Sequence, residues 1–294
     1  MSYNMVLTKG DEKMSIADLY FKDEVNEILT NGFNDKNYPV RPKWPDGTPA
    51  HTIKTFCAVR TYDLSKEFPI LTLRTQAFKG VVRELLWMWQ KKSNVVNDLG
   101  KSASIWRAWE GKDGTIGKTY GYQLGKVSDY GYGKFDQVDN LIYLLKNKPM
   151  DRRMITTMWC PQDLNEMNLP PCVYETLWDV TDGKLNCTVI QRSGDLLAAA
   201  ASGGWDTIQY AVLVHMLAQV CGYQPGTLVH IVNNLHIYDR HVDLVKEVIE
   251  NPEYPGPQLK LNPEVKDFYK FTEDDFELVG YQSTKLSTKF EVAE

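Results

Sequence analysis

The stretch that decides the fold is Leu169-Pro170-Pro171-Cys172-Val173-Tyr174-Glu175-Thr176, followed by Gln191-Arg192-Ser193-Gly194-Asp195. The residues between these two motifs are typical of two strands joined by a turn at Asp182-Gly183. Such a hairpin returns Arg192 to the side of Cys172, whose backbone the two prolines restrict. Because a neighbouring guanidinium favours the thiolate, we expect Cys172 to be a nucleophile. The alternative is a buried core cysteine, which is the commoner fate of a free cysteine.

Bulk composition limits the class of protein. The chain has 294 residues, of which 43% are hydrophobic and 24% charged, which is typical of a globular protein. A net charge of −5 without a long basic run disfavours duplex nucleic acid as a partner. Five cysteines without a CxxC spacing disfavour a disulfide framework or a metal site. With no long apolar run and no signal segment, we expect a cytoplasmic protein that spans no membrane.

The order of the expected elements predicts one α+β domain over residues 1–294, with 1–14 as a loose N-terminal extension. Helices are expected where apolar residues recur at helical spacing, and strands where short apolar runs are bounded by turn residues. The expected helices are 16–32, 76–91, 136–146, 207–220 and 242–250, the expected strands are 51–62, 153–160, 173–193 as a pair and 229–232, and 105–125 is expected to be irregular. Without regular strand–helix alternation, we expect a mixed or antiparallel sheet with packed helices.

Further motifs occur in a fixed order along the chain. They are Val40-Arg41 with Asp46-Gly47-Thr48, Arg83-Glu84-Leu85-Leu86-Trp87, Ile105-Trp106, Tyr120-Gly121, Asp151-Arg152-Arg153, His236-Ile237-Tyr238, and Asn262-Pro263 running on to Phe276. Together with the two opening motifs, they make the chain resemble the thymidylate synthase family over residues 15–294. The resemblance implies a homodimer of α+β subunits packed sheet to sheet. It also implies transfer of a one-carbon unit from 5,10-methylenetetrahydrofolate, a cosubstrate, to C5 of a pyrimidine nucleotide, without a metal.

The resemblance assigns the chemistry to two side chains. Cys172 would add to C6 of the base and so push electron density toward C5. Glu84 would be the general acid/base and would order water near the C4 substituent, with its pKa raised in the pocket. The alternative for Glu84 is a surface glutamate on an amphipathic helix. Its apolar neighbours Leu85, Leu86 and Trp87 weigh against that alternative.

Other residues carried over from the family would bind the nucleotide. Arg41, Arg192 and Ser193 would hold the phosphate together with Arg152 and Arg153, which the resemblance places on the other subunit. The alternative for the arginine pair is two solvated surface charges. His236 and Tyr238 would contact the sugar, and Gln191 also belongs to the substrate site.

A second group would bind the folate. Trp106, Trp109, Tyr120 and Asp195 would border it, with Asp195 accepting a hydrogen bond from the pterin and Tyr120 lying at the catalytic centre. Core packing is the alternative for the aromatic side chains. The C-terminal residues 290–294, which include Ala293, resemble a tail that closes over the site.

One segment departs from the family pattern. Residues 196–206 are about three residues longer than usual, and Asp206 stands where the family has the asparagine that reads the base, if Gln209-Tyr210 fixes the register. An aspartate can accept a hydrogen bond from the cytosine amino group, whereas a carboxylate facing uracil O4 costs about 1–3 kcal/mol. Two further positions also favour cytosine. Leu235 stands where synthases usually have a small residue, and Arg107 stands where they usually have an aspartate. We therefore predict a deoxycytidylate hydroxymethylase or methylase.

Alternatives to this prediction stay open. The alignment can be slipped within the inserted loop, so that another group reads the base. The chain can be a thymidylate synthase that converts dUMP to dTMP. It can also be a catalytically silent family member that binds a nucleotide or RNA, although the retained cysteine, glutamate and arginines argue against this. A ribonucleotide substrate is likewise open.

Overall fold

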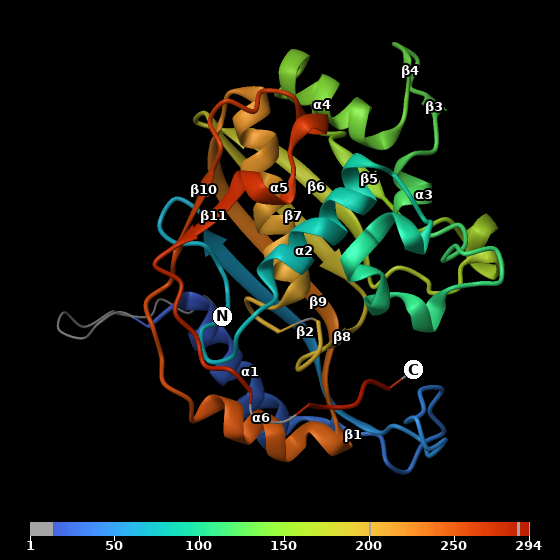
Figure 1. Cartoon of the computed structure of the whole chain (residues 1–294), viewed down its shortest axis with the longest axis vertical. Coiled ribbons are helices and arrows are strands. Elements are labelled where there is room, and N and C mark those ends of the chain that lie inside the picture. The colour runs from blue at the N-terminus through green and yellow to red at the C-terminus, as the bar shows by residue number, and fades with distance from the viewer. Residues whose placement is uncertain (1–13, 200, 287–288, 294) are drawn as a thin grey trace.

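A central mixed sheet of seven strands organises the chain. The computed structural model describes residues 14–199, 201–286 and 289–293, and all but the last residue of the predicted N-terminal extension lie outside this range. The strand order is β1-β2-β9-β7-β6-β5, and β8 pairs with β9. The strands of this sheet are β1 Phe33–Asn34, β2 Thr52–Asp63, β5 Ile155–Thr157, β6 Val173–Thr181, β7 Lys184–Gln191, β8 Gly194–Asp195 and β9 Gln224–Tyr238. Helices lie in front of the sheet (Figure 1).

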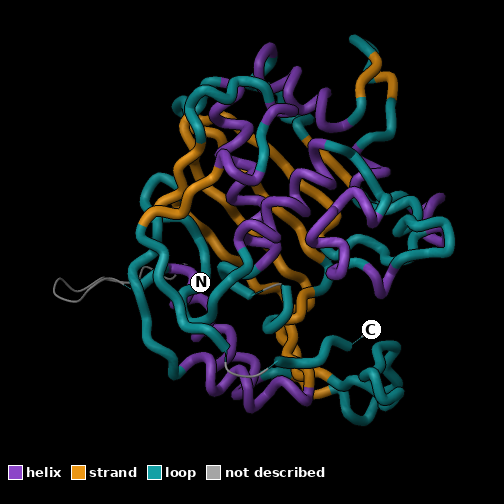
Figure 2. The backbone as a smooth tube through the Cα atoms, viewed as in Figure 1, coloured by secondary structure: helices purple, strands orange, loops and turns teal. Residues whose placement is uncertain are grey.

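The helices and the remaining strands complete the α+β fold, as Figure 2 shows. The α-helices are α1 Ile16–Asn31, α2 Phe78–Leu85, α3 Gly121–Leu124, α4 Gln137–Asn147, α5 Trp205–Cys221 and α6 Val242–Ile249. Two small antiparallel pairs are formed by β3 Ser128–Asp129 with β4 Lys134–Phe135, and by β10 Gln258–Leu261 with β11 Phe276–Val279. Among the described residues, no helix is long and apolar enough to cross a membrane.

The predicted hairpin is confirmed. Strands β6 and β7 pair antiparallel, and Asp182 and Gly183 both take positive φ angles in the turn, 50° and 71°. Two successive positive φ angles match the twist that a two-residue hairpin turn needs. Because Val173 pairs with Gln191, the residues just outside the hairpin, Cys172 and Arg192, come to lie side by side.

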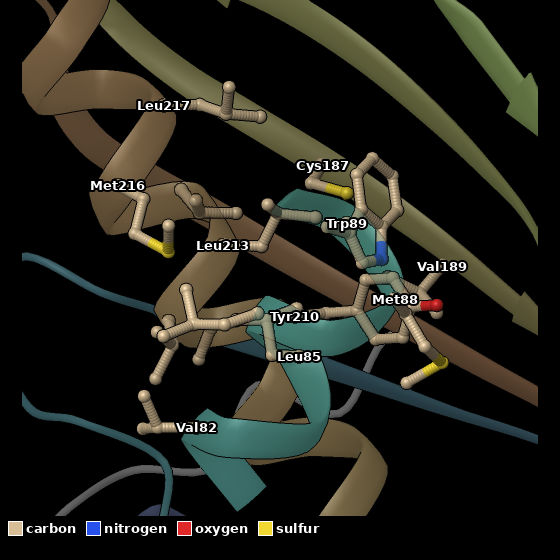
Figure 3. Packing of buried hydrophobic residues seen from close by; sticks show 14 of the residues in the cluster. Val82, Leu85, Met88, Trp89, Cys187, Val189, Tyr210, Leu213, Met216 and Leu217 are labelled. Atoms are coloured by element: carbon tan, nitrogen blue, oxygen red, sulfur yellow. The ribbon is translucent and has the colours of Figure 1, made fainter. Parts of the chain in front are cut away.

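A parallel crossover links β7 to β9 through helix α5. Parallel strands need such a crossover, because the chain must return to the end of the sheet where the first strand began before the next strand can run in the same direction. Helix α5 is apolar nearly all round, and 12 of its 17 residues are buried. Its Tyr210 and Leu213 pack against Leu85 of α2 and against Cys187 and Val189 of β7 (Figure 3).

Several predicted boundaries differ from the structure. The single helix expected over 76–91 is α2 followed by a π-helical turn, η1 Leu86–Gln90. The strand expected over 229–232 belongs to the much longer β9, and the strand expected over 153–160 is shortened to β5. The segment expected to be irregular contains the 3₁₀ turn η3 Arg107–Trp109 and the short α3. Pairing partners in the sheet set strand length, and these are not visible in local sequence.

Candidate active site

Cys172 lies at the point where the chain enters β6, and Arg192 lies where it leaves β7. The Arg192 backbone N–H donates to the Cys172 carbonyl at 2.9 Å, and Arg192 Nη2 lies 3.8 Å from the Cys172 sulfur. The guanidinium is held by the carbonyls of Pro170 and Pro171, at 2.8 and 2.9 Å. The Cys172 N–H donates to the Tyr120 hydroxyl at 3.1 Å. The two prolines thus position the arginine as well as the cysteine.

The pKa of the Cys172 thiol reflects burial more than the neighbouring arginine. Burial raises the pKa of the Cys172 thiol above its ordinary value, and this outweighs the lowering by Arg192 and Arg41. The nearby Asp206 carboxyl raises the pKa further. The guanidinium favours the thiolate as predicted, but the net pKa of the thiol is raised, because desolvation is the larger effect.

Glu84 lies on the buried face of α2 and is only 4% exposed, which rejects the surface alternative. Its Oε2 accepts from the Trp106 indole at 2.8 Å, and its Oε1 accepts from Trp205 at 2.9 Å and from Gln209 at 2.8 Å. Burial raises the pKa of Glu84, and the three hydrogen bonds oppose that rise. The predicted direction of its pKa shift is confirmed.

Trp205 and Gln209 were not identified as site residues from the sequence. They are four residues apart in α5, a spacing that places two side chains on one face of a helix. The sequence did contain a signal for them, because Trp205 and Gln209 flank Asp206 at this helical spacing. It carries meaning only once α2 is known to pack against α5.

Asp206 lies in the first turn of α5 and is half-buried. Its Oδ2 accepts from Gln191 Nε2 at 2.8 Å, and the same nitrogen donates to the Ser193 carbonyl at 3.0 Å. Gln191 Oε1 lies 2.8 Å from His230 Nε2. Burial, with the Glu84 charge, raises the pKa of Asp206 to about 7. Asp206 lies within the electrostatic surroundings of Cys172, Glu84 and Tyr120, so its position as the base-reading residue stays a prediction that this placement is consistent with.

His236 and Tyr238 end strand β9 on the same side of the molecule. Their ring centroids are 5.0 Å apart, and both residues are buried. Burial raises the pKa of the Tyr238 hydroxyl to about 12; the charges of Asp195 and Cys172 add to this rise, and the charge of Arg41 opposes it. These charge contributions show that Tyr238 lies near Cys172.

Asp195 lies in β8, and the pairing of β8 with β9 fixes the position of its backbone. Its Oδ1 accepts from the Leu197 N–H at 2.9 Å, whereas its Oδ2 is buried without a hydrogen-bond partner among the described residues. His241 Nδ1 lies 3.9 Å from Oδ1, and His241 Nε2 lies 2.8 Å from the Glu291 carbonyl of the C-terminal segment. An unpaired buried carboxylate oxygen is a ready acceptor for a ligand N–H.

The predicted aromatic residues form one cluster. The Trp106 ring lies 5.5 Å from Trp109 and 5.3 Å from Tyr120, centroid to centroid, in edge-to-face geometry. Trp106 and Tyr120 are buried, and Trp109 is half-buried. Since the Trp106 indole also donates to Glu84, the cluster borders the glutamate directly.

The remaining arginines divide into two sets. Arg41 is exposed, and its charge acts on Cys172 and Tyr238. Arg152 and Arg153 are exposed, and the Arg153 guanidinium donates two hydrogen bonds to Asp151 on the same chain. Within the described parts of the chain, no contact brings this pair to Cys172. The described residues also contain no group of three or more His, Cys, Asp or Glu side chains that would hold a metal ion.

Comparisons with known proteins identify the family. The family model described as thymidylate synthase matches residues 19–294. The chain belongs to the thymidylate synthase family. It is 46% identical to the thymidylate synthases of Bacillus subtilis subsp. natto and of Bacillus phage phi3T, in each case over 92% of this chain and 96% of the relative. The solved structure of the thermostable thymidylate synthase A from Bacillus subtilis superimposes with a TM-score of 0.88 at 44% identity, covering 94% of this chain and 99% of the other.

The family assignment confirms the resemblance and the α+β fold, but the prediction of a deoxycytidylate hydroxymethylase is wrong. The curated relatives, at 46% identity over 92% of the chain, are thymidylate synthases and support the alternative reading. The physical error was to treat Asp206 as a carboxylate. Its surroundings raise its pKa to about 7, so near neutral pH the side chain is present both as the carboxylate and as the neutral acid.

Proposed function

We propose that this protein is a thymidylate synthase that methylates C5 of dUMP to form dTMP, with 5,10-methylenetetrahydrofolate as cosubstrate. The observation that carries this proposal is the approach of the Arg192 guanidinium to the Cys172 sulfur, with the buried Glu84 linked to the same surroundings through the charge of Asp206. When bound, the folate supplies the one-carbon unit and the hydride that reduces it to a methyl group. The enzyme's own residues position the base, activate it and move protons.

Cys172 is the nucleophile. Its thiolate adds to C6 of uracil, the C5–C6 double bond opens, and electron density moves to C5 and O4. The pKa of the thiol is raised in the free enzyme, so the reactive state must be favoured by the substrate or by proton transfer within the site. The fixed Arg192 guanidinium stabilises the thiolate as it forms.

Glu84 is the general acid/base. Its two oxygens already accept three hydrogen bonds, which hold the carboxyl group in one orientation. A raised pKa suits a group that must both take up and return a proton near neutral pH. Tyr120, whose hydroxyl accepts from the Cys172 N–H, holds the backbone of the nucleophile in place.

The nucleotide site runs from the phosphate to the base. Arg41, Arg192 and Ser193 bind the phosphate, whose paired oxygens suit guanidinium groups. His236 and Tyr238 contact the sugar. Gln191 and Asp206, joined by their 2.8 Å hydrogen bond, face the base.

The folate site fits the residues present. Asp195 Oδ2 is an unpaired buried acceptor that suits an N–H of the pterin, and Trp106 and Trp109 offer apolar surface for its rings. The C-terminal tail closes this side of the site. Its Ala293 packs on Trp44 and Tyr238 beside the nucleotide residues.

We further propose a homodimer in which Arg152 and Arg153 reach the phosphate of the partner subunit. One face of the sheet supports this proposal. Ile155 and Leu177 are exposed and pair directly, and Val59 of β2 is exposed on the same sheet. Apolar side chains exposed on a sheet typically mark an interface.

Incubation of the purified protein with methylenetetrahydrofolate and dUMP tests the activity. The expected result is dTMP, identified by mass, together with an equal amount of dihydrofolate, since the hydride comes from the folate ring. Cys172→Ala provides the inactive control. A product without dihydrofolate, or no product from dUMP, would contradict the proposed reaction.

A further inference from the structure

We infer that Asp206 recognises uracil as a neutral carboxylic acid, and that the hydrogen-bonded chain Ser193–Gln191–His230–Thr207 determines which of its oxygens carries the proton. The inference rests on the proposed function, because it concerns how dUMP is selected. It also accounts for an aspartate at a position where a carboxylate would oppose the substrate.

The orientation of the Gln191 amide follows from the Ser193 carbonyl. A carbonyl oxygen only accepts hydrogen bonds, so the group 3.0 Å from it is the Gln191 NH₂. The second proton of that NH₂ points to Asp206 Oδ2 at 2.8 Å. Asp206 Oδ2 is therefore an acceptor in this arrangement.

The other end of the amide fixes the histidine. Gln191 Oε1 is an acceptor, so His230 Nε2, 2.8 Å away, carries a proton. Burial, with the charge of Arg60, lowers the pKa of His230 well below its ordinary value, so the ring is neutral and its Nδ1 accepts from the Thr207 hydroxyl at 3.1 Å. The chain is thus polarised in one direction, and every member of it is buried or half-buried.

This polarised chain determines which oxygen of Asp206 can carry a proton. Because Oδ2 receives the Gln191 proton, a proton on the Asp206 carboxyl belongs on Oδ1. The neutral acid then presents a donor, Oδ1–H, beside an acceptor, the second lone pair of Oδ2. Uracil presents the complementary pair, with an acceptor at O4 and a donor at N3–H, so the acid forms two hydrogen bonds to the base. Cytosine presents the reverse order.

The surroundings of Asp206 raise its pKa to about 7, so the neutral acid is substantially populated near neutral pH. Glu84 of α2 faces it and opposes a second negative charge, and the polar groups of Tyr120, Cys172 and Tyr210 interact with it as well. Arg60 of β2 favours the carboxylate, but Arg60 is itself paired with Glu24. Burial is the largest effect, and it raises the pKa.

Calorimetric binding of dUMP tests the inference without requiring turnover. Titrations at about pH 6 and about pH 9, each in two buffers of different ionisation enthalpy, measure affinity and proton uptake together. For the wild-type protein we expect uptake of up to one proton at the higher pH and an affinity that falls about tenfold for each pH unit above the pKa of Asp206. Asp206→Asn, which offers the same donor and acceptor without titrating, should bind dUMP with no such additional uptake or decline. Titration of the dUMP phosphate is common to both proteins and cancels in the comparison.

Infrared difference spectra give a second measurement. Binding of dUMP to the wild-type protein at the higher pH should produce a protonated-carboxyl band. If Asp206→Asn does not fold, this band and the wild-type proton uptake still decide the matter. An identical pH dependence in the two proteins, or tighter binding of dCMP than of dUMP at every pH, would overturn the inference. Failure of the proposed function is distinguishable, because it would appear as dUMP binding without formation of dTMP.

Discussion

The Gln209 side-chain amide donates to Glu84 Oε1 at 2.8 Å and so joins helix α5 to helix α2 at the proposed catalytic centre. Trp205, one turn earlier in α5, donates to the same oxygen at 2.9 Å. Asp206, which lies between them in sequence, interacts with Glu84 through its charge. The start of α5 therefore positions both the proposed acid/base and the proposed base-reading residue. Any change that shifts this helix should affect chemistry and specificity together.

The Glu84 carboxyl should be essential for turnover. Glu84→Gln keeps the shape of the side chain but removes its ability to exchange a proton, so kcat for dUMP should fall by about 10²- to 10⁴-fold while binding of dUMP changes little. Steady-state kinetics and calorimetry measure the two effects. Glu277→Gln, at an exposed position in β11, is the matched control and should retain full activity. A Glu84→Gln enzyme with normal kcat would exclude the assigned role.

The raised pKa of Cys172 should be visible in its chemical reactivity. Alkylation of the thiol requires the thiolate, so its rate in the free enzyme should rise with pH above the range of an ordinary thiol. Arg192→Ala removes the cation 3.8 Å from the sulfur and should shift this profile to higher pH. Peptide mapping by mass spectrometry follows each cysteine, and Cys160 in the same sample is the internal control. A profile unchanged by Arg192→Ala would show that the guanidinium does not act on the thiol.

Mixing two inactive variants tests the shared phosphate site. Cys172→Ala lacks the nucleophile, and Arg152→Ala/Arg153→Ala lacks the arginines proposed to reach the partner. If each site combines one cysteine with the partner's arginines, an equal mixture that exchanges subunits should recover about a quarter of the wild-type activity. Either variant alone should be nearly inactive. No recovery, despite subunit exchange shown by native mass spectrometry, would place both arginines in the same site as their own Cys172.

The C-terminal tail should affect folate more than nucleotide. Phe290 lies 5.4 Å from the His241 ring, centroid to centroid, and Arg240 pairs with Glu291, so these contacts hold the tail near Asp195. Phe290→Ala should raise the KM for methylenetetrahydrofolate several-fold and lower kcat, leaving dUMP affinity unchanged. Val127→Ala, at an exposed position away from the tail, is the control. Equal losses in dUMP and folate binding would point to a general disturbance of the fold.

The stability of the protein should depend on Asp206 in a defined pH window. The folded-state pKa of about 7 lies above the ordinary aspartate value of 3.8, so the folded protein holds this proton more tightly than the unfolded chain. The resulting stability is fully present below the unfolded pKa and is lost as pH rises through about 7. Asp206→Asn removes this dependence, so its Tm relative to the wild type should increase from about pH 5 to about pH 8. A constant difference between the two Tm values would show that Asp206 does not titrate in this range.

Some parts of this enzyme could be predicted from the sequence because the signal is local. The Asp182-Gly183 turn, the apolar run of α5 and the Pro170-Pro171-Cys172 motif each restrict their own backbone or the strands next to it. The hairpin pairing therefore followed, and with it the approach of Arg192 to Cys172. The order of the motifs along the chain is itself enough to indicate the family.

Only the tertiary structure decided the protonation and the alignment of the site residues, because both depend on segments that are distant in sequence. Residue types alone predicted a readily ionised Cys172 and a charged Asp206, yet desolvation by segments distant in sequence raises the pKa of both groups. Gln191, His230 and Thr207 come from β7, β9 and α5, and only the parallel crossover aligns them behind Asp206. The sequence by itself determined which groups are present and how each segment folds. Packing determined their protonation, because the free energy of a charge depends on everything within a few ångströms and not on its neighbours along the chain.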